Sequence, residues 1–221
     1  MSGKLKVAVL LENHPYDVVN FQKMFESFED CECYIQPLHL FNQNDDDNDQ
    51  NRKNYDTVIY YNMNIDIPKE GSALAKYMTD EVGASKQGII VMHHGLLNFK
   101  GWDLFTDVCG LKNRGEGGIF KYTQNQKVEG KVINAAHPTM AGIDKLSIID
   151  ETYILGEPEE SGNEILMTTD NETSIKNIAW VRQYKQSRVF CTASGHNNLA
   201  YSDLTYRKML HNAILWTSGK I

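Results

Sequence analysis

The sequence contains little cysteine, and its spacing suggests neither a disulfide scaffold nor a zinc ribbon. Four of the 221 residues are cysteines, and a single residue separates Cys31 from Cys33. Zinc ribbons and thioredoxin-like redox sites use Cys-x-x-Cys spacing, and small disulfide-rich proteins have a higher cysteine density. We therefore expect free thiols and a reducing compartment, the cytoplasm.

A long hydrophobic run and an excess of positive charge are also missing. A membrane helix needs about 20 apolar residues in succession, and no segment approaches that length. The early apolar run Val7–Leu11 is short and lacks a cleavage-site pattern, which is typical of a first strand rather than of a signal peptide. With a net charge of −7, the chain has no basic surface for nucleic acid or an anionic membrane, and neither is an expected partner.

Several motifs of nucleotide binding and hydrolysis do not occur, among them GxGxxG, the Walker A loop, HExxH and GxSxG. The acidic segment 42–54 spaces its aspartates as a calcium loop does. However, Gln50 stands where that loop needs glycine, and Asp56 stands where it needs a bidentate glutamate. We therefore predict a solvated loop at this segment.

The first half of the chain alternates strand and helix patterns. Strand patterns cover 6–12, 31–38, 55–62 and 87–93, and apolar residues at helical spacing follow the first and third. This alternation favours βαβ units, with a mostly parallel central sheet and helices on both faces. Shorter strand-like runs in the second half predict a small antiparallel extension. We predict one α/β domain over residues 1–221.

The chain ends in a predicted helix over 202–220. Ser202 or Asp203 can cap its start, and Gly219 follows as a stop. Its apolar face is predicted to consist of Tyr206, Met209, Leu210, Ala213, Ile214 and Thr217.

Histidines follow several of the predicted strands. The stretch "GIIVMHHGLL" ends a buried strand in His93 and His94, and His14 and His196 also follow strand ends. The carboxyl ends of parallel strands meet at one edge of a sheet, where ligands bind. A helix starting near Leu96 would place a partial positive charge beside the histidine pair, which favours neutral imidazole able to ligate a metal or bond a substrate oxygen. Alternatively, the pair only satisfies backbone groups at a loop.

Adjacent side chains on a strand point to opposite faces. One histidine of the pair is therefore expected to face the cleft while the other packs beneath it. Another histidine, His137, ends the strand-like run "KVINAAHP".

Other polar and aromatic residues have two interpretations each. Asp150 and Glu151 lie in the apolar run "IIDETYIL", where a carboxylate either pairs with Arg182 or a histidine, or serves as a metal ligand or general base. Trp102 is either a core residue or a wall on which a sugar stacks. Asn197 either contacts a ligand or bonds the backbone of its own turn.

Five segments resemble the trehalose-utilisation (ThuA-like) family in their order and approximate spacing. They are "GIIVMHHG", "HPTMAGI", "IIDETYIL", "RVFCTASGH" and "YRKMLHNAILWTSG". The resemblance covers about residues 88–219 segment by segment, and the first half agrees in its general α/β pattern. It implies a flavodoxin-like, class I glutamine-amidotransferase-like fold.

In true amidotransferases of this superfamily, the tight turn after a central strand carries a nucleophilic cysteine. The comparable turn here ends in His94 and Gly95, so the resemblance argues against glutamine hydrolysis through a thioester. Family members also often have a histidine after a Gly-Gly turn, and "GGIFKYTQNQ" lacks it, which weakens the case for a metal. The residues that match the family's segments are His94, His137, Asp150, Glu151, Tyr153 and His196.

Our leading hypothesis is a ThuA-like protein of sugar utilisation, acting on a trehalose-type or oxidised sugar bound at the carboxyl edge of the strands. As an enzyme it would be a metal-assisted hydrolase or isomerase with His94, His196 and Glu151 as catalytic residues. A zinc-like divalent ion would be held by His94, His137 and His196. The residues expected to bind the ligand are His93, Trp102, Asp150, Tyr153 and Asn197.

An alternative hypothesis is a non-catalytic binding or regulatory protein that kept the fold without the cysteine nucleophile. A third is an amidohydrolase that uses Cys109 or Cys191, although neither follows a predicted strand-to-turn elbow. The expected partner is a small-molecule sugar or sugar derivative. A second copy of the chain is a further expected partner if the helices carry more apolar surface than the core needs.

Overall fold

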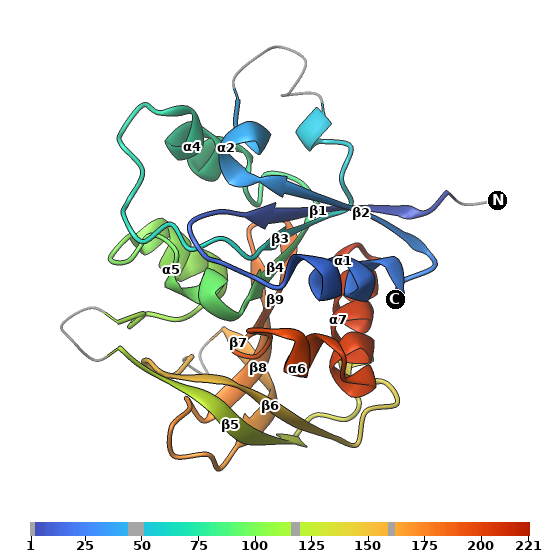
Figure 1. Cartoon of the computed structure of the whole chain (residues 1–221). Coiled ribbons are helices and arrows are strands. Elements are labelled where there is room, and N and C mark those ends of the chain that lie inside the picture. Colours follow the sequence, from blue (N-terminus) through green and yellow to red (C-terminus); the bar gives the residue numbers. More distant parts are fainter. Residues whose placement is uncertain (1–2, 44–50, 116–119, 159–161) are drawn as a thin grey trace.

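The computed structural model describes residues 3–43, 51–115, 120–158 and 162–221. Its centre is one nine-stranded sheet with the strand order β2-β1-β3-β4-β9-β8-β7-β5-β6 (Figure 1). The predicted loop at 42–54 lies largely outside the described residues, because 44–50 are not among them.

The first half of the sheet is parallel, as the apolar runs predict. It consists of β1 (Leu5–Leu11), β2 (Cys31–Pro37), β3 (Thr57–Tyr60), β4 (Gly88–Met92) and β9 (Ser187–Thr192). All residues of β3 and β4 are buried, because helices cover both faces of this part of the sheet. A strand covered on both faces needs a continuous apolar sequence rather than an alternating one.

The second half of the sheet is antiparallel and large. It contains β5 (Lys121–Val132), β6 (Lys145–Ile154), β7 (Asn163–Thr169) and β8 (Asn177–Tyr184). The expectation of a mostly parallel sheet with a small antiparallel extension is therefore wrong: the sheet is mixed, and its two longest strands are antiparallel. Short connections such as the turn between β8 and β9 permit only antiparallel pairing.

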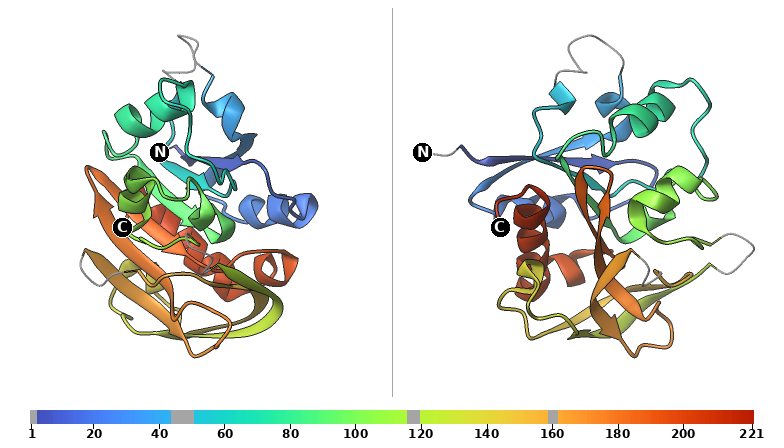
Figure 2. Two further views of the ribbon diagram at one scale, coloured as in Figure 1. Left: turned by 90° about the vertical axis from the view of Figure 1, so that its left-hand side faces the viewer. Right: turned by 180° about the vertical axis from the view of Figure 1, so that it is seen from behind.

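Helices lie on both sides of the parallel half (Figures 1 and 2). On one side are α1 (Val18–Glu26) and the terminal helix α7 (Leu204–Thr217), and on the other is α5 (Asp103–Cys109). The remaining helical elements are short: α2 (Leu38–Phe41), α4 (Ala73–Lys76), the π-helical turn η1 (Tyr77–Glu81), the 3₁₀ turns η2 (His93–Leu97) and η4 (Pro138–Met140), and α6 (Asn198–Tyr201).

The terminal helix follows the sequence prediction closely. Asp203 caps α7 by accepting a hydrogen bond from the backbone N–H of Tyr206 at 2.8 Å. The buried residues of α7 are the six expected from the apolar pattern. No helix within the described ranges has the length and apolar character to cross a lipid bilayer.

Candidate functional site

The turn after β4 is sharper than the sequence indicates. A helical turn begins at His93 itself rather than near Leu96, and His93 has a left-handed backbone with φ of +49°. A non-glycine residue at positive φ between a strand and a helix stores strain, which is a feature of nucleophile elbows. Two residues on, a Cβ at Gly95 would lie 2.2 Å from the backbone oxygen of Tyr60, so only glycine fits there.

His93 is held by two neighbouring strands. Its Nδ1 lies 2.8 Å from the backbone oxygen of Ala193, which can only accept, so Nδ1 carries the proton and Nε2 presents a lone pair. The Tyr153 hydroxyl lies 2.8 Å from Nε2 and donates to it, and the two rings stack with centroids 4.5 Å apart. The unprotonated Nε2 therefore faces the side of the molecule on which β6 lies.

Glu151 lies between two histidines. Its Oε1 is 3.5 Å from Nε2 of His93 and 3.6 Å from Nδ1 of His196. Burial opposes ionisation of this carboxyl, but His93 and then His196 lower its pKa to about 2. Burial and the charge of His93 lower the pKa of His196 to about 4. At neutral pH the cluster therefore consists of a carboxylate and a neutral His196 imidazole whose Nδ1 has no hydrogen-bond partner.

Asp150, the neighbour of Glu151, positions His196 through the backbone. The buried Asp150 carboxylate accepts hydrogen bonds from the N–H groups of Gly195 at 2.7 Å, His196 at 2.9 Å and Glu151 at 3.0 Å. Burial raises the pKa of Asp150 despite these bonds. Because adjacent strand residues face opposite sides, Asp150 holds the loop after β9 while Glu151 faces the histidines.

His94 lies beneath the cluster in the core. Its Nε2 donates to the backbone oxygen of Tyr61 at 2.7 Å, and its ring stacks on His14. Burial, with the nearby charges of His93 and His14, lowers the pKa of His94 well below its ordinary value. Both histidines of the pair are buried, and it is His93, rather than His94, that contacts Glu151.

A pocket of about 350 Å³ lies over the cluster, at the carboxyl ends of β1, β3, β4 and β9. Glu151, Tyr153 and His196 line it together with His14. Apolar and polar residues of the surrounding elements complete the wall: Pro15, Met63, Ile65, Leu97, Lys100, Phe120, Tyr122 and Gln124. The strand edge expected from the parallel pattern therefore carries a pocket.

Three residues of the predicted site have their contacts elsewhere. His137 begins the 3₁₀ turn η4, where its Nδ1 lies 2.8 Å from the Thr139 hydroxyl and its ring packs on Trp216 of α7. Trp102 precedes α5 and packs edge-to-face on Phe99. Asn197 caps α6 by accepting from the N–H of Leu199, as its polar-turn interpretation predicts.

The cysteines are distant from a nucleophilic role. Cys109 ends α5 and Cys191 lies in β9, both fully buried, and burial raises the pKa of each thiol. Raised pKa values leave these thiols protonated and unreactive.

The sequence did not reveal every residue of the pocket. His14 gave a signal, since it follows the first strand, but it matched no family segment. Phe120, Tyr122 and Lys100 gave none, because aromatic and basic residues near turns are common. Tyr61 supports the loop from below: its hydroxyl donates to the backbone oxygens of Gly195 at 2.9 Å or His196 at 3.0 Å.

This arrangement defines an amidotransferase-like α/β protein in which histidine replaces cysteine at the elbow. Solved structures support the fold. A ThuA-like protein from Parabacteroides merdae superposes with a TM-score of 0.73 at 16% identity, covering 98% of this chain and 91% of that one. A cytoplasmic protein from Salmonella typhimurium gives 0.68 at 12% identity, covering 96% and 99%. A protein of the GMP synthase type from Thermoplasma acidophilum gives 0.57 at 10% identity, covering 97% and 94%.

The chain belongs to the ThuA family, described as trehalose utilisation, whose family model matches residues 12–217. The match confirms the resemblance and extends it into the first half of the chain. A comparison with functionally curated proteins found no match.

Proposed function

We propose that this protein binds a carbohydrate-derived ligand in the pocket at the strand edge, above a divalent metal ion held by His93, Glu151 and His196. The observation that carries the proposal is the convergence of these three side chains: one ligand atom from each lies within 4.8 Å of the others. Two histidines and a glutamate form a ligand set found in catalytic zinc sites, which keep a further position open for water or substrate.

The residues fit such an ion in their protonation as well. The bond from His93 Nδ1 to Ala193 leaves the lone pair of Nε2 available, and a backbone partner of this kind is common behind metal-bound histidines. Glu151 is ionised at neutral pH, and Nδ1 of His196 is buried without a hydrogen-bond partner. When bound, a divalent ion supplies polarisation of a carbonyl or activation of a water.

The pocket wall supports a sugar as the ligand. Phe120, Tyr122 and Tyr153 offer aromatic surface, and Gln124 and Lys100 offer polar groups. Its volume of about 350 Å³ falls within the range of small-molecule sites, about 300–1,000 Å³. The family's association with trehalose utilisation favours a trehalose-type or oxidised sugar. We propose the cytoplasm as its compartment, as for the Salmonella protein of the same fold.

As an enzyme, the protein would be a metal-assisted hydrolase or isomerase. Tyr153, bonded to His93, and Glu151 are the groups placed to hold or move a proton beside a bound sugar. The absence of cysteine from the turn after β4 favours a second candidate, a non-catalytic sugar-binding protein. Turnover of trehalose or of an oxidised disaccharide, followed by product chromatography, would separate the two.

Metal binding is the first test. Protein dialysed free of metal should bind Zn²⁺ in calorimetry, and both Glu151→Gln and His196→Ala should bind one equivalent fewer than the wild type. His137→Ala is the matched control, because this histidine packs on Trp216 away from the cluster, and its stoichiometry should stay that of the wild type. Equal stoichiometry and affinity in the wild type and Glu151→Gln would remove the metal from the proposal.

Ligand binding is tested separately. Trehalose, its oxidised derivatives and sucrose should be compared by thermal shift on metal-loaded wild-type protein and on Tyr122→Ala, whose side chain is 59% exposed and lies at the pocket wall. A sugar that raises the melting temperature of the wild type and not of Tyr122→Ala supports the pocket. No shift with any sugar, or equal shifts in both proteins, would contradict it.

A further inference from the structure

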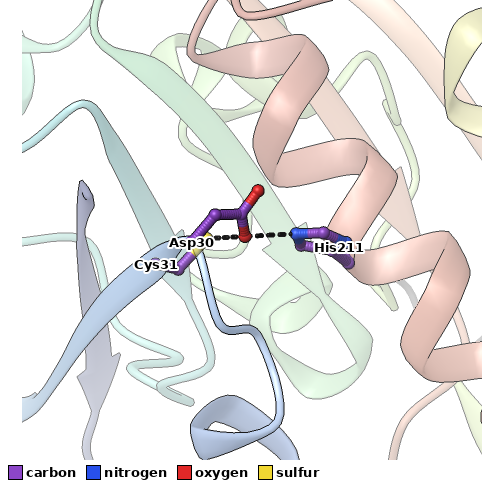
Figure 3. A group of neighbouring side chains, drawn as sticks. All are labelled: Asp30, Cys31 and His211. Carbon is purple, nitrogen blue, oxygen red and sulfur yellow. Dashed lines mark hydrogen bonds and ion pairs between the residues drawn. The ribbon is translucent and has the colours of Figure 1, made fainter. Parts of the chain in front are cut away.

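A second group of possible metal ligands joins the two ends of the chain, apart from the pocket. Asp30 and Cys31 stand at the start of β2, and His211 lies on α7 (Figure 3). The Asp30 carboxylate accepts from both neighbours: its Oδ1 lies 2.6 Å from Nε2 of His211 and 3.5 Å from Sγ of Cys31. One ligand atom from each residue lies within 4.8 Å of the other two.

We propose that Asp30, Cys31 and His211 bind a zinc-type divalent ion that clamps the edge strand β2 to the terminal helix. Thiolate, imidazole and carboxylate are the three protein ligands that zinc prefers, and a water would fill the fourth position. A thiolate and a carboxylate together neutralise the two charges of the ion, so the site as a whole carries no net charge.

The surroundings prepare the site for an ion. The His211 ring stacks on Phe28 with centroids 5.1 Å apart, which fixes the direction of Nε2. The Asp30 side chain is 53% exposed and that of His211 is 29% exposed, whereas Cys31 is buried. The carboxylate side therefore gives the ion a path from solvent, and the sulfur lies in a place shielded from it.

Binding exchanges protons for the ion. Burial raises the pKa of the Cys31 thiol, so the metal-free protein holds it as S–H, and a coordinating metal removes that proton. The thiol proton passes to solvent, the Nε2 proton of a neutral His211 moves to Nδ1 through solvent, and Sγ, Nε2 and a carboxylate oxygen bind the metal. The Asp30 carboxylate, which now lies between its neighbours (Figure 3), turns aside to admit the ion.

The clamp acts on the edge of the sheet. Within the described sheet β2 pairs only with β1, and the backbone oxygen of Asp30 accepts from the N–H of Leu5 at the start of β1. An ion at Asp30 therefore ties both strands to α7, across about 180 residues of sequence. It stabilises the folded state because the unfolded chain does not hold the three ligands together.

Cobalt distinguishes this site from the pocket, because only this one contains sulfur. Co²⁺ added to metal-free wild-type protein should give a sulfur-to-cobalt charge-transfer absorption that saturates at one equivalent and disappears on adding Zn²⁺. The band should be absent in Cys31→Ser and should need at least about tenfold more Co²⁺ in His211→Gln. It should persist in Glu151→Gln.

Two matched controls complete the test. Cys33→Ser removes the other cysteine of β2. His39→Gln removes a histidine that contacts Glu12 at the same 2.6 Å separation without a sulfur nearby. Both should keep the band. Zn²⁺ should also raise the melting temperature of the Glu151→Gln protein, and not that of Glu151→Gln/Cys31→Ser. The proposal fails if the wild type gives no such band, if Cys31→Ser keeps it, or if His211→Gln binds Co²⁺ as tightly as the wild type.

Discussion

His14 and His94 stack face to face, with ring centroids 3.9 Å apart and ring planes inclined by 22°. Both have a buried Nδ1 without a hydrogen-bond partner. Burial lowers the pKa of both histidines, and each lowers that of the other or is lowered by the nearby His93. The stack is therefore compatible with two neutral rings and opposed to a proton on either.

The stack predicts that the protein loses stability in mild acid. The folded-state pKa of His14, His94 and His196 lies below the ordinary value of 6.5, and that of His196 is about 4. As the pH falls from 6.5 towards 4, the unfolded chain binds protons that the folded protein does not, so the free energy of unfolding falls. The buried His94 alone sets a slope of up to about 1.4 kcal/mol per pH unit. Urea unfolding at pH 7.5, 6.5 and 5.5 measures it.

A double variant provides the control for this effect. His14→Gln/His94→Gln should flatten the dependence between pH 6.5 and 5.5, whereas His39→Gln should not, because His39 is exposed. Equal stability of the wild type at pH 7.5 and 5.5 would contradict the buried neutral pair.

The left-handed backbone of His93 predicts an unusual order of glycine and alanine. His93→Gly and His93→Ala lose the same bonds to Ala193 and Tyr153, so they differ only in the backbone. Because φ is +49°, the glycine variant should be more stable by about 1 kcal/mol. At Gln22 on the exposed face of α1, alanine should instead be more stable than glycine by about 1 kcal/mol. Urea unfolding of the four proteins checks this; an alanine advantage at both positions would contradict the strained turn.

The three hydrogen bonds of Asp150 predict a large effect of a small change. In Asp150→Asn, one carboxylate oxygen becomes an NH₂ group facing backbone N–H groups, so at least one donor at Gly195 or His196 loses its partner. We expect a loss of about 2 kcal/mol in the free energy of unfolding, together with weaker Zn²⁺ binding, because His196 is displaced. Asp203→Asn is the control, since asparagine caps a helix as well as aspartate does. Equal effects of the two substitutions would argue against the role of Asp150.

The parallel half of the fold could be predicted because its strands are buried on both faces and their sequences are correspondingly apolar. The size of the antiparallel half could not. β5 reads "KYTQNQKVEGKV", and most of its residues are exposed or partly so, so its pattern carries little of the alternation that marks a half-buried strand. Its pairing with β6 depends on contacts distant in sequence, which a local pattern does not contain.

The site was predicted in outline for a similar reason. Strand ends and family segments indicated Glu151, Tyr153 and His196, and the structure brings these together beside His93. The choice of His94 over His93 for the functional role depended on adjacent side chains alternating as on a strand. The left-handed turn at His93 breaks that alternation, and no local signal for it exists, since histidine has no special preference for positive φ comparable with glycine. His137 shared the family's pattern, but its ring has a structural contact with Trp216.

The loop that carries His196 depends on a close contact between Gly195 and Tyr206. Gly195 has φ of +117°, and a Cβ there would lie 2.1 Å from the Tyr206 hydroxyl oxygen, which bonds the backbone oxygen of Ser194. Gly195→Ala should therefore lower the free energy of unfolding by about 3 kcal/mol, through overlap and backbone strain together. Tyr206→Phe alone should cost about 1 kcal/mol.

The double variant separates the two causes. Tyr206→Phe removes the oxygen that the new methyl group meets, so Gly195→Ala/Tyr206→Phe should be more stable than the sum of the single changes predicts, by about 1 kcal/mol or more. The remaining loss measures the cost of placing alanine at this φ. Zn²⁺ binding should follow the same order, because His196 moves with the loop. Strict additivity of the two substitutions would show that the overlap with Tyr206 is not what excludes a side chain at position 195.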